Sequence, residues 1–223
     1  MKWRDTKVMF EPWLGNEYDS GIVGRRVLIL GESHYHDCAD DSVCKDCAKR
    51  DDYHRRLTPT VVNGWCEGDR RSPLSYRVPG LFGLEPREFW RKVVFYNYVQ
   101  GIVAKKPRVR QKDELWTEKN NAEAFQTILD CYRPQRILVL GKKLWTNLPS
   151  DEGPLNGKPP RPEYNLTVSN NIGSYNKVDE CCYWYESRSG IPALAMPIMH
   201  PSAPRFQLDQ WRQPVAGWLN YAQ

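Results

Sequence analysis

Two short stretches decide the fold, Arg25-Arg26-Val27-Leu28-Ile29-Leu30-Gly31 and Arg136-Ile137-Leu138-Val139-Leu140-Gly141. Each is an unbroken apolar run that ends at a glycine, which is typical of a strand that is buried on both faces. Buried strands that lack polar alternation belong to parallel sheets covered by helices on both sides. The two stretches therefore predict an α/β protein.

Further strands and helices are expected around this pair. Val93–Tyr98 and Ile191–Met199 read as strands, whereas Glu85–Lys92, Glu114–Cys131 and Leu208–Tyr221 read as helices. Strands and helices thus alternate along the chain. That alternation predicts a three-layer α/β/α sandwich with a central, mostly parallel sheet.

The chain of 223 residues fits one large domain, so we expect a single domain over residues 1–223. Two polar stretches, at about 36–77 and 150–186, do not follow the alternation. We interpret both as insertions over the edges of the sheet.

Composition excludes some classes of protein. The longest apolar run has five residues, Cys181–Tyr185, which is too short to cross a membrane. Met1–Asp5 lacks the apolar stretch of a signal peptide, so we expect a cytoplasmic protein. The net charge of +5 is too small to identify a nucleic-acid partner by itself.

Polar residues follow the predicted strands. Gly31–His36 follows the first strand, Asn97 lies near the end of another, and His200–Ala203 follows the last. Ligands of such sheets bind beyond the carboxyl ends of the strands. Taken singly, a histidine here is explained by a structural role and an asparagine by a turn.

Taken together and in this order, these segments resemble the uracil-DNA glycosylase superfamily. Its first motif reads Gly-Gln-Asp-Pro-Tyr-His in the best-known uracil enzymes and Gly-Glu-Ala-Pro-Gly in the iron-sulfur branch. Gly31-Glu32-Ser33-His34-Tyr35-His36 looks like a hybrid of the two, and His200-Pro201-Ser202 is similar to the start of the last motif. The resemblance spans about Arg25 to Phe206 and implies a uracil-DNA glycosylase-like fold.

The resemblance also implies roles for individual residues. Where the uracil enzymes carry an aspartate that positions water, this chain has Ser33, so Glu32 becomes the candidate for that role. His200 would donate a hydrogen bond to the departing base, and the amide of Asn97 would read the edge of that base. Tyr35 would exclude thymine. The residues expected to bind substrate are Gly31, Ser33, Tyr35, Asn97 and Ser202. His34 replaces the family's usual proline.

A basic run lies between Ile102 and Lys112, where Lys105, Lys106, Arg108 and Arg110 occur without an acidic residue. One interpretation is a solvated loop, and the other is a surface that contacts the phosphates of DNA. In the second interpretation, Arg205, just after the last motif, would also contact the phosphates.

Four cysteines form a candidate metal site, Cys38, Cys44, Cys47 and Cys66. Their spacing suits tetrahedral zinc, with His36 and His54 as alternative ligands. An iron-sulfur cluster is the rival, although the family's iron-sulfur branch places cysteines before its first motif and this chain has none there. Thiols without a metal are the third alternative.

Two functions follow from these observations. The first is a DNA base-excision glycosylase that hydrolyses the N-glycosidic bond of uracil or another modified base, from single- or double-stranded DNA. The second is a non-catalytic protein that binds nucleic acid or nucleotides and keeps the glycosylase pocket, since Ser33 replaces the aspartate.

Overall fold

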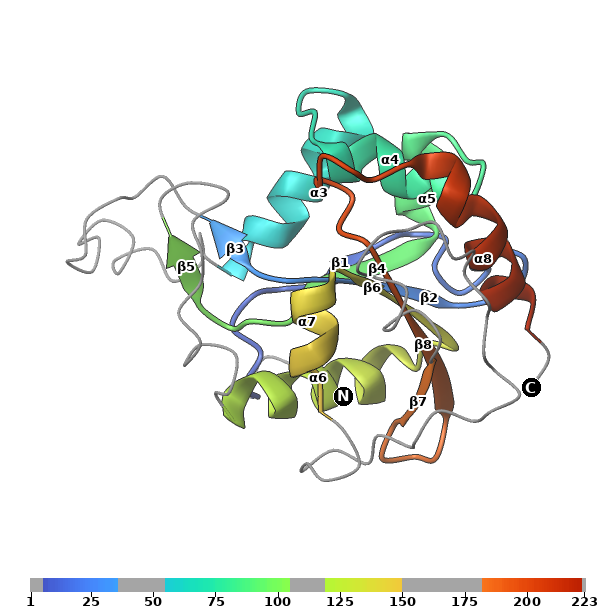
Figure 1. Cartoon of the computed structure of the whole chain (residues 1–223). Helices are drawn as coiled ribbons and strands as arrows, with labels where there is room; N and C mark the ends of the chain where they lie inside the picture. The colour runs from blue at the N-terminus through green and yellow to red at the C-terminus, as the bar shows by residue number, and fades with distance from the viewer. Residues whose placement is uncertain (1–5, 36–54, 105–118, 150–181, 222–223) are drawn as a thin grey trace.

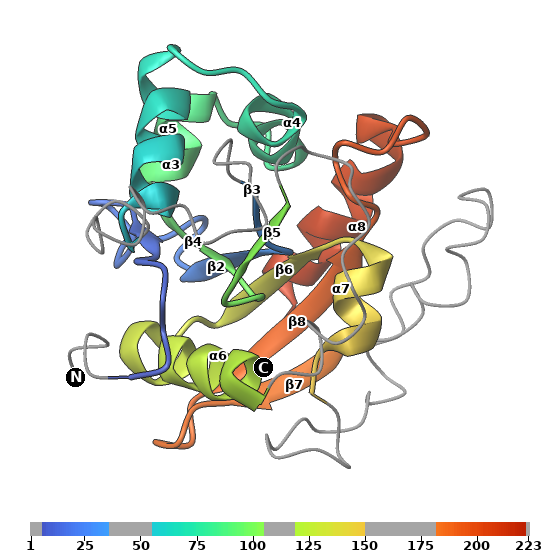
Figure 2. The same ribbon diagram turned by 90° about the vertical axis from the view of Figure 1, so that its left-hand side faces the viewer.

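The computed structural model describes residues 6–35, 55–104, 119–149 and 182–221. Their centre is a six-stranded mixed sheet in the order β1-β4-β2-β6-β8-β7 (Figures 1 and 2). The bounds of its strands are β1 Trp13–Leu14, β2 Val27–Gly31, β4 Val93–Asn97, β6 Arg136–Leu140, β7 Tyr183–Glu186 and β8 Pro192–Ile198. The four inner strands are parallel, whereas β1 and β7 pair antiparallel at the two edges.

Six helices accompany this sheet in the described part of the chain. Their bounds are α3 Leu57–Glu67, α4 Pro73–Leu81, α5 Pro86–Arg91, α6 Lys119–Tyr132, α7 Lys142–Asn147 and α8 Leu208–Asn220. Helices α3, α4, α5 and α8 cover one face of the sheet, and α6 and α7 cover the other (Figure 1).

Alternating side chains of the inner strands explain this arrangement. Val27 and Ile29 of β2 join the first hydrophobic cluster, together with Trp90 of α5 and Trp211 of α8. Leu28 and Leu30 join the second cluster on the other face. The four β2 residues named here are fully buried, which is why the sequence shows an apolar run instead of alternation.

The sequence predictions for these elements are confirmed with small shifts at their ends. All four expected strands are present as β2, β4, β6 and β8, and Glu85–Lys92 corresponds to α5. Helix α8 continues through Pro214 without splitting. The long helix is described from Lys119 onward as α6.

The two predicted insertions need correction where the structure describes them. Within 36–77 lie α3 and the first part of α4, and Val62 and Trp65 of α3 belong to the core under the sheet. Within 150–186 lies β7, which extends the sheet along β8. Proline, glycine and charged residues between the apolar positions concealed the helices of the first stretch. In the second stretch, β7 overlaps the apolar run Cys181–Tyr185, which lies at the end of a segment rich in proline, glycine and polar residues.

The order of the strands places a switch point in the middle of the sheet. From β2 the chain moves to β4 on one side, and it then returns to β6 on the other side of β2. Beyond β2 the chain leads to α3 on one face, and beyond β6 it leads to α7 on the opposite face. Sheets of this kind bind ligands at such a point, beyond the strands' carboxyl ends.

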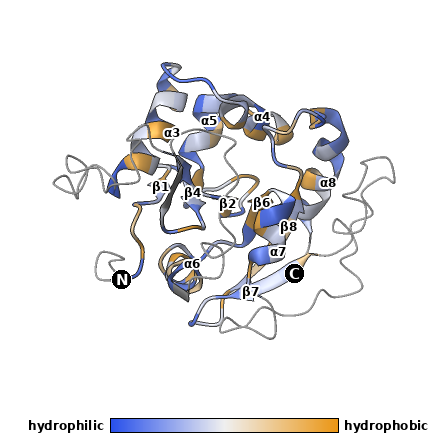
Figure 3. Cartoon of the chain, turned by 60° about the vertical axis from the view of Figure 1, so that its left-hand side comes forward, coloured by the Kyte–Doolittle hydropathy of each residue, from blue (hydrophilic) through white to orange (hydrophobic). Residues whose placement is uncertain are grey.

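Two smaller features complete the fold. A two-stranded parallel sheet pairs β3 (His34–Tyr35) with β5 (Ile102–Ala104). Figure 3 shows hydrophilic residues in the loop before α4 and at the start of α8. No helix among the described residues is long and apolar enough to cross a membrane.

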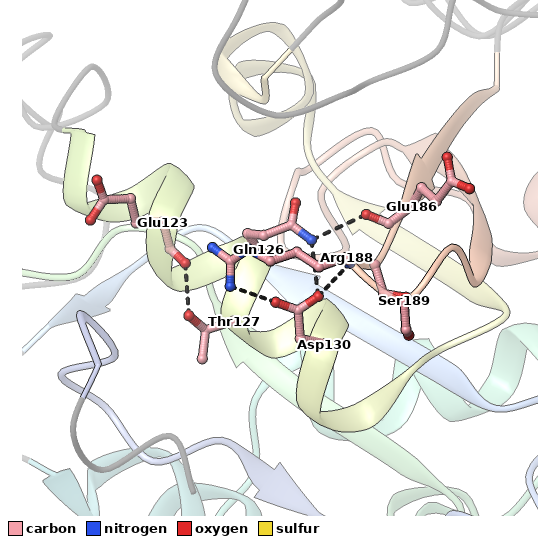
Figure 4. A network of polar contacts seen from close by, with 8 residues as sticks. Glu123, Gln126, Thr127, Asp130, Glu186, Arg188 and Ser189 are labelled. Atoms are coloured by element: carbon pink, nitrogen blue, oxygen red, sulfur yellow. Dashed lines mark hydrogen bonds and ion pairs between the residues drawn. The ribbon is translucent and has the colours of Figure 1, made fainter. Parts of the chain in front are cut away.

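A polar network fastens the β7–β8 turn to α6 (Figure 4). The Asp130 carboxylate accepts hydrogen bonds from the backbone amide of Arg188 at 2.6 Å and from its guanidinium at 2.7 Å. The Gln126 amide donates to the carbonyl of Glu186 at 3.1 Å. This network ties the edge hairpin to α6.

Candidate functional site

The ends of β2 and β4 are held together by backbone hydrogen bonds. The amide of Tyr98 donates to the carbonyl of Gly31, and the amide of Val99 donates to the carbonyl of Glu32, both at 2.9 Å. A Cβ atom on Gly31 would collide with Oδ1 of Asn97. Glycine is therefore needed at this position, and the first motif lies directly against Asn97.

Gly141 marks the point where Glu32 and His200 meet. It follows β6 with a φ of +118°, and its amide donates to the carbonyl of Ile198 at 2.9 Å. A Cβ built there would lie 3.0 Å from Oε1 of Glu32 and 3.5 Å from Cβ of His200. The switch point thus brings together the two predicted catalytic side chains, from the ends of β2 and β8.

The Glu32 carboxyl lies in a largely dry environment. Burial raises its pKa from 4.5 to about 6, and the nearby Lys143 ammonium partly opposes that rise. At neutral pH the group is still mostly ionised, so it can orient water or stabilise a cation.

His200 is neutral at physiological pH, because burial lowers its pKa to about 4. The backbone amide of Ser202 donates to Nδ1 at 3.1 Å, so that nitrogen carries the lone pair. The ring proton of the neutral histidine is therefore assigned to Nε2. A neutral Nε2–H group can donate a hydrogen bond to an anion that forms beside it.

The loop that carries His200 is held by a residue that the sequence did not single out. Arg77 of α4 donates from Nη1 to the carbonyl of Pro201 at 2.5 Å. Its guanidinium carbon lies 5.8 Å from the ring centres of both Tyr76 and Phe206. Sequence reasoning missed Arg77 because it lies in a stretch taken for an insertion.

Asn97 is almost fully buried, with 6% of its surface exposed. Its amide nitrogen Nδ2 lies 3.2 Å from Nε2 and 3.4 Å from Nδ1 of His34. Asn97 and Gly31 thus lie side by side at the ends of paired strands, in register with each other.

Three other predicted substrate residues, Ser33, Tyr35 and Ser202, and the predicted DNA contact Arg205 lie in segments that follow the strands. Ser33 is half-buried in the loop between β2 and β3, and Tyr35 is half-buried in β3. Ser202 and Arg205 are exposed in the loop after β8. The structure places all four on segments that continue from the strand ends.

Two predicted groups are left largely outside the described residues. These are the basic run of Lys105, Lys106, Arg108 and Arg110, and the cysteines Cys38, Cys44 and Cys47. Cys66 is described on α3, half-buried against the first hydrophobic cluster, and burial raises the pKa of its thiol. The described residues contain no group of three or more metal-ligating side chains. The zinc site stays a prediction.

Comparisons with known proteins add no assignment. No model of a protein family matches the chain, and no curated protein matches it either. The resemblance to uracil-DNA glycosylases therefore rests on the motif residues and on their order along the chain.

Proposed function

We propose that this chain is a DNA glycosylase of the uracil-DNA glycosylase type, which hydrolyses the N-glycosidic bond of uracil or another modified base. One observation carries the proposal: Glu32 and His200 both border Gly141 at the switch point of the sheet. They come from the two segments whose sequences resemble the family's first and last motifs.

The chemistry of these two groups suits the reaction. Breaking the bond leaves positive charge on the sugar and negative charge on the base. The Glu32 carboxylate would stabilise the sugar cation and orient the attacking water. The neutral His200 would donate from Nε2 to the base oxygen, where the negative charge develops. Burial strengthens both effects, because water screens the charges less.

The test is cleavage of modified-base oligonucleotides. Single- and double-stranded substrates with uracil and other altered bases should give alkali-labile sites with the wild-type protein. Glu32→Gln should lower the rate by about 10²- to 10⁴-fold, the usual contribution of one acid–base group. Glu67→Gln makes the same chemical change at an exposed position of α3 and serves as the matched control.

His200→Ala should lower the rate by about 10²- to 10³-fold, because it removes the donor to the leaving base. Binding of an uncleavable substrate should change little in either variant. A wild type that cleaves no base while still binding oligonucleotides would reject the enzyme. A fully active Glu32→Gln would keep the enzyme but reject this mechanism.

A second function is favoured by two observations. Ser33 stands where the uracil enzymes carry an aspartate, and the Asn97 amide is buried against His34. We therefore keep a non-catalytic protein that binds nucleic acid or a nucleotide as the alternative. The oligonucleotide panel separates the two functions, since only the enzyme produces abasic sites.

The proposed DNA contact includes the basic run and Arg205. Replacing Lys105 and Arg108 together with alanine should weaken oligonucleotide binding equally for all sequences and reduce its salt dependence. An unchanged salt dependence would identify the run as a solvated loop.

The proposed zinc site is tested by elemental analysis of protein purified without chelator. One zinc per chain, lost in Cys44→Ser, is expected from four thiolate ligands. A brown protein with broad visible absorption would indicate an iron-sulfur cluster instead. Protein without metal would reject both.

A further inference from the structure

The carbonyl of Pro201 and the amide of Ser202 belong to one peptide group, and this group is held from both sides. Arg77 of α4 donates from Nη1 to the carbonyl oxygen at 2.5 Å. The amide donates to Nδ1 of His200 at 3.1 Å. The carbonyl and the N–H group of a trans peptide point in opposite directions. Arg77 and the His200 ring therefore bind opposite sides of the same peptide group.

The direction of each of these hydrogen bonds is fixed by chemistry. A guanidinium and a backbone N–H group only donate, and a carbonyl only accepts. Nδ1 of His200 must therefore present its lone pair to Ser202, and in the neutral ring the proton is on Nε2. Cδ2, the ring atom bonded to Nε2, lies 3.6 Å from the Cβ position at Gly141, which Glu32 also borders. The N–H group thus belongs to the edge of the ring nearer to Gly141.

The same peptide group has a second orientation that would reverse this arrangement. The amide of Ala203 donates to the carbonyl of His200 at 2.8 Å, which closes a turn around Pro201 and Ser202. Ser202 does not have a positive φ, as expected for a type I turn. A half rotation of the central peptide would give a type II turn, which requires positive φ at Ser202. The carbonyl would then face Nδ1, so His200 would carry its proton there and lose the donor at Nε2.

Arg77 binds only the first of these two orientations. Its side chain is half-buried, and its guanidinium carbon lies 5.8 Å from the ring centres of both Tyr76 and Phe206, which favour a cation beside them. A hydrogen bond from a charged donor is about twice as strong as a neutral one, and it polarises the peptide so that the opposite N–H group donates more strongly. A group that binds one of two states shifts the equilibrium toward that state.

We propose that Arg77 is a positioning residue that keeps the proton of the neutral His200 ring on Nε2, by holding the Pro201–Ser202 peptide group in its observed orientation. The use of that proton in catalysis rests on the proposed glycosylase, whereas its place on the ring does not. The donor to the departing base would thus be set by a residue of α4, far from His200 in the sequence.

Nitrogen-15 NMR of the histidine rings tests this inference without a substrate. The chain has four histidines, and the spectrum of His200→Gln identifies the signals of His200. At pH 7 the wild-type ring should show one protonated and one bare nitrogen. In Arg77→Met the ratio of the Nε2–H to the Nδ1–H form should fall about tenfold, because one charge-assisted hydrogen bond is lost. The two nitrogen signals then move toward each other. Arg77→Lys keeps a cation and a donor, so it should restore part of their separation.

Arg212→Met is the matched control. Arg212 of α8 donates from Nε to the carbonyl of Gly80 at 3.1 Å, so this variant also removes a hydrogen bond between an arginine and a backbone carbonyl at α4. The melting temperatures of both variants report how much stability each substitution costs. The His200 signals should stay at their wild-type positions in Arg212→Met. Equal movement in both variants would overturn the inference, because it would show a general loosening around α4.

Cleavage assays separate the failure of this inference from that of the proposed function. In an active glycosylase, kcat of Arg77→Met should fall by the fraction of His200 that has lost Nε2–H in the NMR spectrum, with KM unchanged. His200 signals that do not move in Arg77→Met overturn the inference, whether or not the wild type cleaves DNA. Signals that move, in a protein that cleaves no base, reject the glycosylase and support the positioning of His200. Signals that move while kcat stays at the wild-type value overturn the role of Arg77 in catalysis.

Discussion

Replacing Glu32 by glutamine should make the protein more stable at alkaline pH. The folded-state pKa of Glu32 is about 6, against an ordinary value of 4.5, because burial disfavours the charged form. A carboxyl whose folded pKa is raised favours folding below its unfolded pKa, and this contribution is lost as the pH rises through the folded pKa. The difference between these two pKa values of Glu32 corresponds to about 2 kcal/mol of folding free energy. Glu32→Gln carries no charge to bury, so above pH 6 it does not lose the folding stability that burial of the ionised carboxylate removes from the wild type.

Urea unfolding of the wild type and of Glu32→Gln, each at pH 4 and pH 8, measures the effect. The stability gained through the substitution should be about 2 kcal/mol larger at pH 8 than at pH 4. Glu67→Gln, at an exposed site, is the control for the chemical change itself. Equal gains at both pH values would refute the argument, since they would show that Glu32 is not held in a dry environment. The outcome does not depend on any enzymatic activity.

Three further predictions follow from the same geometry. The cleavage rate should fall as the pH drops below about 6, because Glu32 takes up a proton, and the loss between pH 7 and pH 5 should be about tenfold. Lys143→Met should move this part of the pH–rate profile to higher pH. Gly141→Ala should lower activity at least tenfold in steady-state assays, because the added Cβ meets Glu32 and a φ of +118° strains any L side chain. Arg136→Met should cost about 3 kcal/mol in urea unfolding, because this fully buried guanidinium donates to the carbonyls of Trp218 in the last turn of α8 and of Tyr221 at its end.

The sequence was most informative where burial on both faces of the sheet left a clear pattern. The strands β2 and β6 were predictable because every position in the run from Val27 to Leu30, and from Ile137 to Leu140, is buried. The helices α3 and α4 were not, because each contributes only a few apolar residues to the core. The strand β7 was not either, although it overlaps the apolar run Cys181–Tyr185, because a strand of four residues at the edge of a sheet resembles the polar segment that precedes it more than it resembles a buried strand. Pro73, for example, reads as a loop residue although it occupies the first turn of α4, where proline is tolerated.

The candidate site was predictable in its residue types but not in its contacts. Glycine followed by glutamate, and a histidine after the last strand, stand out in the sequence. That they meet at Gly141 depends on the order of the strands, which no local pattern encodes. The contact between His34 and Asn97 likewise joins segments at two strand ends.

The meeting of Glu32 and His200 at Gly141 has a consequence for the course of folding. Glu32 follows β2, whereas His200, which borders Gly141 together with it, follows β8 much later in the chain. A partly folded state that contains β2, β4 and β6 but lacks β8 would leave this carboxyl in water. Proteins fold more slowly as more of their contacts join residues that are distant in sequence. The raised pKa of Glu32 would therefore report, during refolding, when the segment that follows β8 has docked beside the end of β2.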